Sequence, residues 1–199
     1  MAIAVPPAGT VPERYTVDRY FALVDEGVLR PDDAVELLEG VIVAMAPKGV
    51  RHAAGTCRAG EALRAVLGGR AVVREQNPLV VGQFSVPEPD VAVLPGRIAD
   101  YDTAHPRTAL LAVEVAESSL PQDRLTKAAI YAAAGIPEYW IINLRDDCVE
   151  VHRRPEPGGR RYVERRVAGR GERITLAAFP DAAVAVDDLL PVRGGVTVD

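Results

Sequence analysis

The feature that most constrains this chain is the segment Leu110 to Ala116, which reads LLAVEVA. Apolar side chains occupy both alternating faces of this segment, so a strand formed here must be covered on both sides and lie centrally in a sheet. The exception is Glu114, whose carboxylate would be buried with the rest of the strand. A buried carboxylate is very costly unless a cation accompanies it. The segment therefore predicts a central strand with a basic side chain or a metal ion beside its one acidic group.

A second acidic group opens another short apolar strand. Asp90 follows a proline and precedes the run Val91 to Leu94. If this strand pairs with the one that carries Glu114, the two carboxylates lie about 5 Å apart, the spacing of neighbouring strands. A divalent ion relieves the repulsion between such carboxylates, and oxygen ligands favour Mg²⁺ or Mn²⁺. The alternatives are structural: Asp90 could cap the turn after the proline, and Glu114 could pair with an arginine.

Lysine is rare in this chain, which makes each lysine worth interpreting. Of the 23 lysines and arginines, only Lys48 and Lys127 are lysines. An arginine cannot replace a lysine where a compact ammonium group is needed. Helical spacing places four side chains on one face of a helix that follows the Glu114 strand: Asp123, Arg124, Lys127 and Tyr131. Lys127 could reach back to the two carboxylates, or it could form a surface ion pair with Asp123.

The order of the expected elements is that of a mixed α/β protein, with an α+β-type mixed sheet. Capping residues and terminal glycines bound three expected helices, over 16–26, 50–67 and 119–134. The inner face of the second helix is expected to contain Ala53, Cys57, Leu63, Val66 and Leu67. A hairpin within 34–45 turns at Glu39-Gly40. The other strands are expected over 71–74, 78–81, 90–94, 110–116, 139–143, 149–152, 161–167 and part of 182–190.

The length of 199 residues suits a single domain. We expect that domain to span residues 13–191, with flexible ends at 1–12 and 192–199. No apolar run is long enough for a membrane span, and the N-terminus lacks the pattern of a secretion signal. We therefore expect a cytoplasmic protein without a membrane partner. Cys57 and Cys148 are expected to be reduced and buried.

The net charge of −5 argues against a general nucleic-acid-binding protein, which usually carries a basic surface. Residues 151–175 are an exception, because eight arginines and three glutamates give this segment +5 and leave −10 for the rest. These arginines could face a phosphate backbone, or they could form the solvated outer face of a hairpin. Their strand-like and turn-like positions favour the hairpin.

Several groups of residues together resemble a known family. The most distinctive are Pro89-Asp90, the Val-Glu-Val around Glu114, and the DRxxK pattern of residues 123–127, which runs into YAAAGIPEYW at 131–140. The segments 35–40, 45–47 and 184–190 and the residue His52 add to the likeness. Over roughly residues 15–191 the chain resembles the Uma-two family of restriction endonuclease-like proteins, a branch of the PD-(D/E)XK nuclease superfamily.

This resemblance implies a restriction-endonuclease-like core, in which helices flank a central mixed sheet. It also implies that Asp90 and Glu114 hold a divalent ion, Mg²⁺ or Mn²⁺, and that Lys127 is the catalytic lysine. In the general pattern of the superfamily the lysine lies two residues after the acid, and that position is Ala116 here. In the branch that this chain resembles, the lysine lies on the following helix, as Lys127 does.

Two further site residues follow from the same resemblance. Glu36 matches the acidic residue of the N-terminal hairpin and could be another ligand or a partner of metal-bound water. Glu39, in the turn of that hairpin, is a weaker candidate. His52 could contact a phosphate or a metal-bound water, or it could be an ordinary surface histidine at the start of a helix.

The function expected from these residues is that of a Mg²⁺-dependent endonuclease that hydrolyses phosphodiester bonds of nucleic acid, expected to be DNA. The metal would activate the attacking water and Lys127 would position it. The resemblance also suggests a homodimer. The alternative is a catalytically weak or inactive nuclease-fold protein that binds nucleic acid or protein, a reading favoured by the acidic composition and the displaced lysine.

Overall fold

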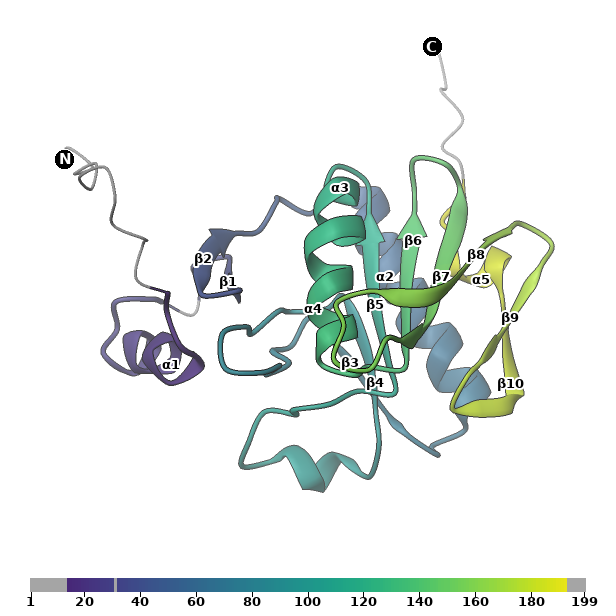
Figure 1. Ribbon diagram of the computed structural model, residues 1–199. Coiled ribbons are helices and arrows are strands. Elements are labelled where there is room, and N and C mark those ends of the chain that lie inside the picture. The colour runs from purple at the N-terminus through teal and green to yellow at the C-terminus, as the bar shows by residue number, and fades with distance from the viewer. Residues whose placement is uncertain (1–13, 31, 193–199) are drawn as a thin grey trace, which may run out of the picture.

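The computed structural model describes residues 14–30 and 32–192, and its centre is a six-stranded mixed sheet (Figure 1). The strand order is β3-β4-β5-β6-β7-β8. Strands β5 and β6 are parallel, and every other neighbouring pair in this sheet is antiparallel. The bounds are β3 Val72–Glu75, β4 Val91–Leu94, β5 Leu111–Ala116, β6 Glu138–Asn143, β7 Cys148–Pro155 and β8 Tyr162–Gly169. The predicted central mixed sheet is confirmed.

Helices cover both faces of this sheet (Figure 1). Helix α2 (Val50–Leu67) packs on one face, together with β9 (Arg173–Leu176), β10 (Phe179–Ala185) and α5 (Val186–Leu189). A continuous helical segment lies across the other face. It consists of α3 (Leu120–Gln122), the π-helical turn η2 (Asp123–Lys127) and α4 (Ala128–Ala133). Every residue of β5 is buried, as the apolar pattern of this strand predicts.

The N-terminal part stands beside the main sheet (Figure 1). It contains α1 (Val17–Asp25) and a hairpin of β1 (Val35–Leu38) and β2 (Val41–Ala44). The predicted turn is confirmed: Glu39 and Gly40 have φ values of 52° and 84°, as a two-residue hairpin turn with two left-handed positions requires. A bridge between β1 and the loop before β4 joins the hairpin to the rest of the chain.

The inner face of α2 differs from the prediction. Ala53 and Cys57 are exposed, and the buried residues are Gly55, Thr56, Ala59, Gly60, Leu63 and Leu67. A Cβ atom on Gly55 would lie 2.9 Å from Cγ1 of Val115, so small residues allow α2 to approach β5 closely. The prediction is confirmed for Leu63 and Leu67, and Val66 packs against the core. It is wrong for Ala53 and Cys57, because the first part of the helix contacts the sheet through Gly55 and not through larger side chains.

Other details of the prediction also need correction. Residues 78–81 form no strand, and Val81 makes only an isolated bridge with Ser85. Both cysteines are free thiols, but Cys57 is exposed and Cys148 is partly exposed, so the predicted burial is wrong. The 3-10 turn η1 (Ile98–Tyr101) and strand β9 were not predicted. The expected flexible ends are 1–12 and 192–199; all of these residues except Val192, which is exposed, lie outside the described residues. Within the described ranges, no helix combines the length and apolar character that a membrane crossing requires.

Candidate active site

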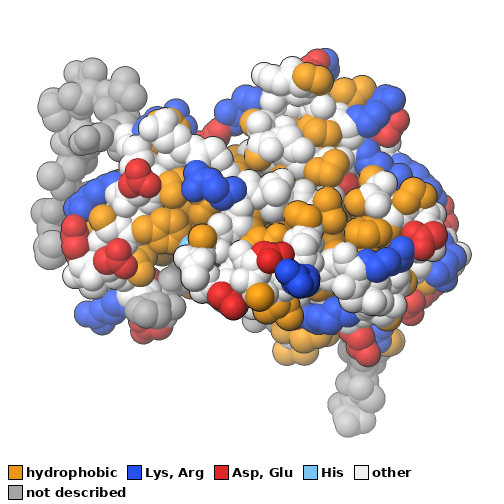
Figure 2. Space-filling model, turned by 90° about the horizontal axis from the view of Figure 1, so that it is seen from below, with side chains coloured by type: hydrophobic (Ala, Val, Ile, Leu, Met, Phe, Trp, Pro, Cys, Tyr) orange, Lys and Arg blue, Asp and Glu red, His pale blue; other side chains and the backbone are white. Residues whose placement is uncertain are grey.

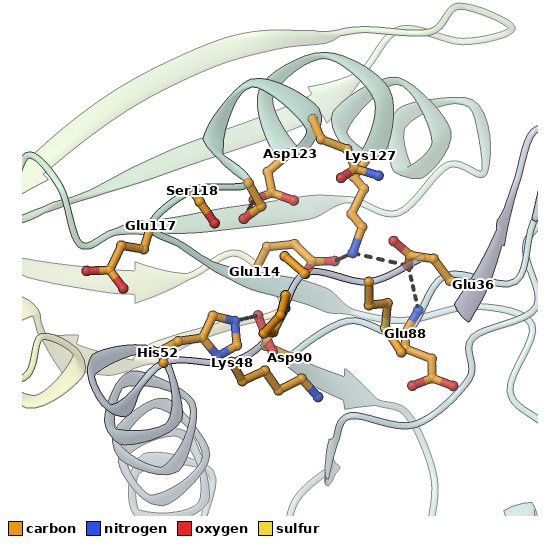
Figure 3. Close-up of a pocket in the computed structure, with 16 residues that line it drawn as sticks. Glu36, Lys48, His52, Glu88, Asp90, Glu114, Glu117, Ser118, Asp123 and Lys127 are labelled. Atoms are coloured by element: carbon orange, nitrogen blue, oxygen red, sulfur yellow. Dashed lines mark hydrogen bonds and ion pairs between the residues drawn. The ribbon is translucent and has the colours of Figure 1, made fainter. Parts of the chain in front are cut away.

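Five side chains predicted to form the site line one pocket (Figure 3). They come from five separate parts of the chain: Glu36 from β1, His52 from α2, Asp90 from the loop before β4, Glu114 from β5 and Lys127 from η2. The fold therefore brings together residues that are as much as 91 positions apart in sequence. The pocket wall also includes Lys48, Glu88, Glu117, Ser118, Ser119, Gln122 and Asp123.

The two expected ligand carboxylates belong to neighbouring strands. Val91 of β4 pairs with Val113 of β5, and Asp90 and Glu114 occupy the next position along each strand. Asp90 is 6% exposed and Glu114 is 3% exposed. The Asp90 Oδ2 atom also accepts a 2.8 Å hydrogen bond from the backbone N–H of Val115. The strand pairing that would bring the carboxylates together is thus present.

Lys127 is buried among carboxylates. Its Nζ atom lies 3.1 Å from Oε1 of Glu114 and 3.2 Å from Oε2 of Glu36. The Tyr131 hydroxyl donates a 2.7 Å hydrogen bond to the same Oε1 atom of Glu114. A surface ion pair between Lys127 and Asp123 is ruled out as an interpretation, because both residues are buried. The lysine therefore faces the two expected acidic residues from the helix side.

His52 holds one of the ligand carboxylates. Its Nε2 atom lies 3.1 Å from Oδ2 of Asp90, while its buried Nδ1 atom has no hydrogen-bond partner among the described residues. The amide of Gln76 donates to the other oxygen of Asp90 at 3.3 Å. His52 is therefore a contact of the site and not an ordinary surface histidine.

Acidic groups outnumber basic groups in the pocket wall. Six carboxylates face Lys48, Lys127 and His52, and they belong to Glu36, Glu88, Asp90, Glu114, Glu117 and Asp123. Burial raises the pKa of Glu114 well above its ordinary value; the charge of Lys127 opposes this shift, and nearby carboxylates add to it. The pKa of Asp90 behaves differently: burial would raise it, but the contact with His52 and the Val115 N–H hold it below its ordinary value.

The carboxylates of Asp90 and Glu114 are suited to act as two ligands of a divalent ion. Within 14–30 and 32–192, no three His, Cys, Asp or Glu side chains converge as a complete metal-binding group. Mg²⁺ is commonly bound by one or two carboxylates, with water and substrate phosphates filling its other positions. Burial is the main cause of the raised pKa of Glu114, and the charges of Asp123, Asp90 and Glu36 add to it; a divalent cation would relieve the repulsion among these carboxylates. Asp90 and Glu114 are the residues that would hold such an ion.

Two candidate features of the sequence lie elsewhere. Glu39 forms an ion pair with Arg160 and lines a different pocket. Seven of the eight arginines in 151–175 form ion pairs with carboxylates of the chain: Arg153, Arg154, Arg160, Arg161, Arg165, Arg166 and Arg170. Figure 2 shows a face on which basic side chains are dispersed among acidic and hydrophobic ones. These contacts support the hairpin interpretation over a phosphate-binding patch.

Some residues of the site received no role from the sequence. Asp123 is buried and accepts a 2.7 Å hydrogen bond from the Ser119 hydroxyl. Its spacing of four residues from Lys127 was a usable signal, since such residues share a helix face. Glu88 had no comparable signal: its backbone N–H donates to Oε2 of Glu36 at 3.3 Å across a long sequence separation.

Comparisons with known proteins identify the family and the fold. The chain matches the family model Uma2, described as "Putative restriction endonuclease", over residues 17–189. A crystal structure of a "putative nuclease belonging to DUF820" from Anabaena variabilis superposes with a TM-score of 0.69 at 19% identity, over 87% of this chain and 96% of that chain. At this identity the likeness establishes the fold. No curated protein matches the sequence.

Proposed function

The chain belongs to the Uma2 family, described as "Putative restriction endonuclease", and from this premise we propose that it is a divalent-metal-dependent endonuclease acting on DNA. Family and fold support a nuclease role. The observation that carries the proposal is the shared pocket of Asp90, Glu114 and Lys127. We further propose a homodimer, and sedimentation that finds only monomer at micromolar concentration would remove this expectation.

The carboxylates and the lysine have different roles in this proposal. Asp90 and Glu114 would hold the cation, and His52 would orient Asp90 through its 3.1 Å contact. When bound, a Mg²⁺ or Mn²⁺ ion supplies Lewis-acid polarisation of the phosphate and makes a bound water more acidic. Glu36 and Glu114 hold the ammonium group of Lys127 beside the cleavage position.

Lys127 acts as a cation and hydrogen-bond donor, not as a general base. Burial would lower its pKa, but the charges of Glu114, Glu36 and Asp123 raise it above the ordinary lysine value. The ammonium group therefore stays charged at neutral pH. A fixed positive charge stabilises the negative charge that develops on a phosphate during attack, and its N–H groups orient the attacking water.

The second candidate function is binding without cleavage. The acidic pocket wall and the ion-paired arginines favour this second function, because a nuclease usually binds the DNA backbone with basic side chains that are not paired within the protein. Such a protein would bind nucleic acid or another protein and release it unchanged with every metal.

Purified protein incubated with single- and double-stranded DNA and RNA, in Mg²⁺, Mn²⁺ or EDTA, separates the two functions. We expect metal-dependent cleavage of DNA that Asp90→Asn and Lys127→Met each reduce by about 100-fold or more. Glu156→Gln, on the exposed hairpin, is the matched control and should cleave normally. Cleavage that survives both site substitutions would overturn the proposed mechanism. Binding without turnover under any metal would favour the second candidate.

A further inference from the structure

A second buried carboxylate lies on the same face of the sheet as Glu114. Glu150 of β7 is 1% exposed. Glu114 pairs with Ile141 on β6, and Ile141 pairs with Glu150 on β7. Side chains of residues paired across neighbouring strands point to the same face. Glu114 and Glu150 therefore flank Ile141, about 10 Å apart at two strand spacings, beneath the helical segment α3-η2-α4.

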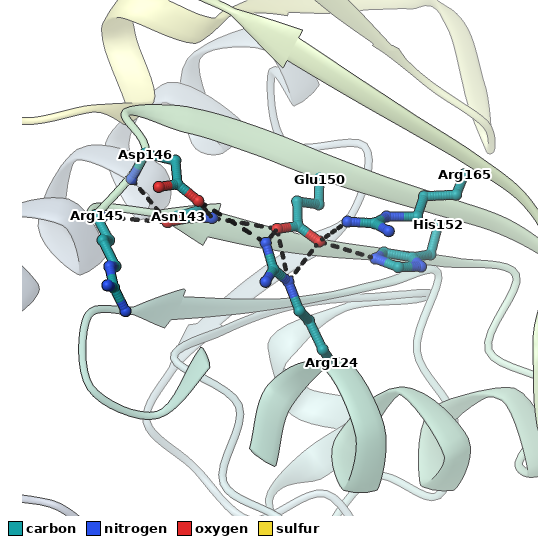
Figure 4. Close-up of polar contacts among 7 residues, drawn as sticks. All are labelled: Arg124, Asn143, Arg145, Asp146, Glu150, His152 and Arg165. Atoms are coloured by element: carbon teal, nitrogen blue, oxygen red, sulfur yellow. Dashed lines mark hydrogen bonds and ion pairs between the residues drawn. The ribbon is translucent and has the colours of Figure 1, made fainter. Parts of the chain in front are cut away.

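Four side chains contact Glu150, and one of them comes from that helical segment (Figure 4). Arg124 Nε donates to the two oxygens of Glu150 at 3.0 and 3.2 Å. Arg165 of β8 donates to Oε2 at 2.8 Å, and the Asn143 amide of β6 donates to Oε1 at 3.2 Å. His152 of β7 places Nε2 3.8 Å from Oε2. Of these four partners, only Arg124 links the helical segment to the carboxylate.

Arg124 and Lys127 belong to one π-helical turn but reach different strands. The sequence placed both on one face of an α-helix; in the structure the turn is π-helical, and both side chains reach the same face of the sheet, where Arg124 contacts Glu150 on β7 and Lys127 contacts Glu114 on β5. A π-helical turn is wider than an α-helical one, because its hydrogen bonds join residues i and i+5. The wider turn separates the two basic side chains so that each meets its own carboxylate.

We propose that the Arg124–Glu150 ion pair is a positioning device that holds Lys127 against Glu114. Lys127 joins η2 to β5, and the Tyr139 hydroxyl of β6 donates a 3.1 Å hydrogen bond to the backbone carbonyl of Asp123 in the same turn. Arg124 adds a contact to β7, on the other side of Ile141, and this contact fixes the direction of the turn across the sheet. An arginine that contacts both oxygens of a carboxylate suits this task, because its planar group constrains geometry as well as charge. That this ion pair affects catalysis rests on the proposed function. That it positions Lys127 does not.

Arg165 provides a matched control because it binds the same carboxylate from a strand. Arg124→Gln and Arg165→Gln each leave Glu150 with one arginine and with Asn143. Arg124 contacts both oxygens of Glu150 and Arg165 contacts one, so both variants weaken the same carboxylate's pairing. Only Arg124→Gln removes the link to η2, so only this variant should change the surroundings of Lys127.

The presence of only two lysines makes the test direct. Protein with ¹³C-labelled lysine gives NMR signals from Lys48 and Lys127, and Lys127→Met assigns them. We expect the Lys127 signal to shift and broaden in Arg124→Gln and to stay unchanged in Arg165→Gln, with Lys48 as internal reference. An unchanged Lys127 signal in Arg124→Gln, or an equal change in both variants, would overturn the proposal. If Arg124→Gln does not fold, Arg124→Lys replaces it, because it keeps the charge and loses the two-oxygen contact.

Cleavage kinetics provide the second readout. We expect kcat to fall about 10- to 100-fold in Arg124→Gln, the range seen when groups that orient a site are removed, with little change in KM. In a Lys127→Met background, Arg124→Gln should cause no further loss, since it acts through the lysine. A further loss of the same size would count against a positioning role. A wild-type protein that cleaves nothing would overturn the proposed function, while the NMR result would still decide whether Arg124 positions Lys127.

Discussion

Two buried carboxylates on one sheet face meet opposite electrostatic surroundings. We call Glu114 with Lys127, Glu36 and Tyr131 the Glu114 centre, and Glu150 with Arg124, Arg165 and Asn143 the Glu150 centre. In the Glu114 centre, burial and neighbouring acids raise the pKa of the carboxyl well above its ordinary value, although Lys127 opposes the shift. In the Glu150 centre, burial is outweighed by the hydrogen bonds and charges of its partners, which hold the pKa of Glu150 below its ordinary value.

The difference separates a structural ion pair from a site prepared for a ligand. Glu150 meets two arginines, so its negative charge is more than compensated within the chain. Glu114 shares one lysine with Glu36 and lies near Asp90 and Asp123. Such a deficit of positive charge is costly in a buried region unless a cation can enter. The same sheet and helix thus carry one centre in which two arginines face one carboxylate and one in which a single lysine faces two.

The largest effect should come from removing the basic member of the Glu114 centre. We expect Lys127→Met to lower kcat for DNA cleavage by about 100- to 1,000-fold, the scale for loss of one preorganised electrostatic group. Initial rates under saturating Mn²⁺ measure this effect. Arg165→Gln removes a basic member of the Glu150 centre and should leave kcat within about twofold, since Arg165 touches no residue of the pocket wall. Equal losses in the two variants would erase the functional difference between the centres.

The next largest effect should be on the free energy of unfolding when either buried glutamate is replaced by glutamine. The loss should depend on pH in opposite directions for Glu150 and Glu114. The pKa of Glu150 is lowered in the folded state, so its stabilisation is present above its ordinary pKa and is lost as the pH falls. The pKa of Glu114 is raised in the folded state. The contribution of Glu114 to the free energy of unfolding is therefore complete below its ordinary pKa and is lost as the pH rises. Glu150→Gln should therefore lower the free energy of unfolding by about 1.5–3 kcal/mol at pH 7, as for the loss of a charged hydrogen bond. The loss should be smaller at pH 4.

Glu114→Gln should show the reverse trend, with a penalty that shrinks as the pH rises from 4 to 8. Urea unfolding of both variants and the wild type in EDTA measures the free energy of unfolding without the influence of a metal. Parallel pH profiles for the two variants would show that the electrostatic contrast between the centres is not real.

Much of the Glu114 centre could be predicted from the sequence, for a physical reason. The uninterrupted apolar run around Glu114 determines a central strand, and a buried acid within it requires a cation. The helical spacing left open whether Lys127 reaches the carboxylates or pairs with Asp123, and Glu36 on β1 could not be placed beside Glu114 by pattern alone, because that contact crosses a long sequence separation. The resemblance to a known family supplied Lys127, Glu36 and His52, and the structure places all three around one pocket.

The Glu150 centre escaped prediction because a local irregularity creates it. The π-helical turn that separates Arg124 from Lys127 interrupts the periodicity of 3.6 residues on which the helical interpretation depended. Glu150 itself lies in a strand that begins a polar hairpin, where acidic residues are usually exposed. The same limit applies to α2, where Gly55 is buried because it permits a close approach to β5, which hydrophobicity cannot reveal.

A smaller effect should distinguish the two lysines of the pocket. Lys127 is 6% exposed, whereas Lys48 lies in the exposed loop between β2 and α2 at the edge of the pocket. Lys48→Ala should raise KM for DNA several-fold, reduce the salt dependence of binding by about one phosphate contact, and leave kcat nearly unchanged. Binding titrations at several salt concentrations measure this. A fall in kcat without a change in KM would place Lys48 within the Glu114 centre instead of at its entrance.

The smallest effect should come from an ion pair that belongs to neither centre. Arg154 and Glu164 lie 3.0 Å apart on the β7–β8 hairpin, with side chains that are 65% and 48% exposed. Water and salt screen such a pair, so Glu164→Gln should change the free energy of unfolding by less than about 0.5 kcal/mol at any pH between 4 and 8. Urea unfolding beside Glu150→Gln is the measurement, because both glutamates pair with arginine on the same hairpin. A cost at Glu164 equal to that at Glu150 would mean that burial does not distinguish the Glu150 centre from an ordinary surface pair, and its proposed role in fixing η2 would lose its energetic basis.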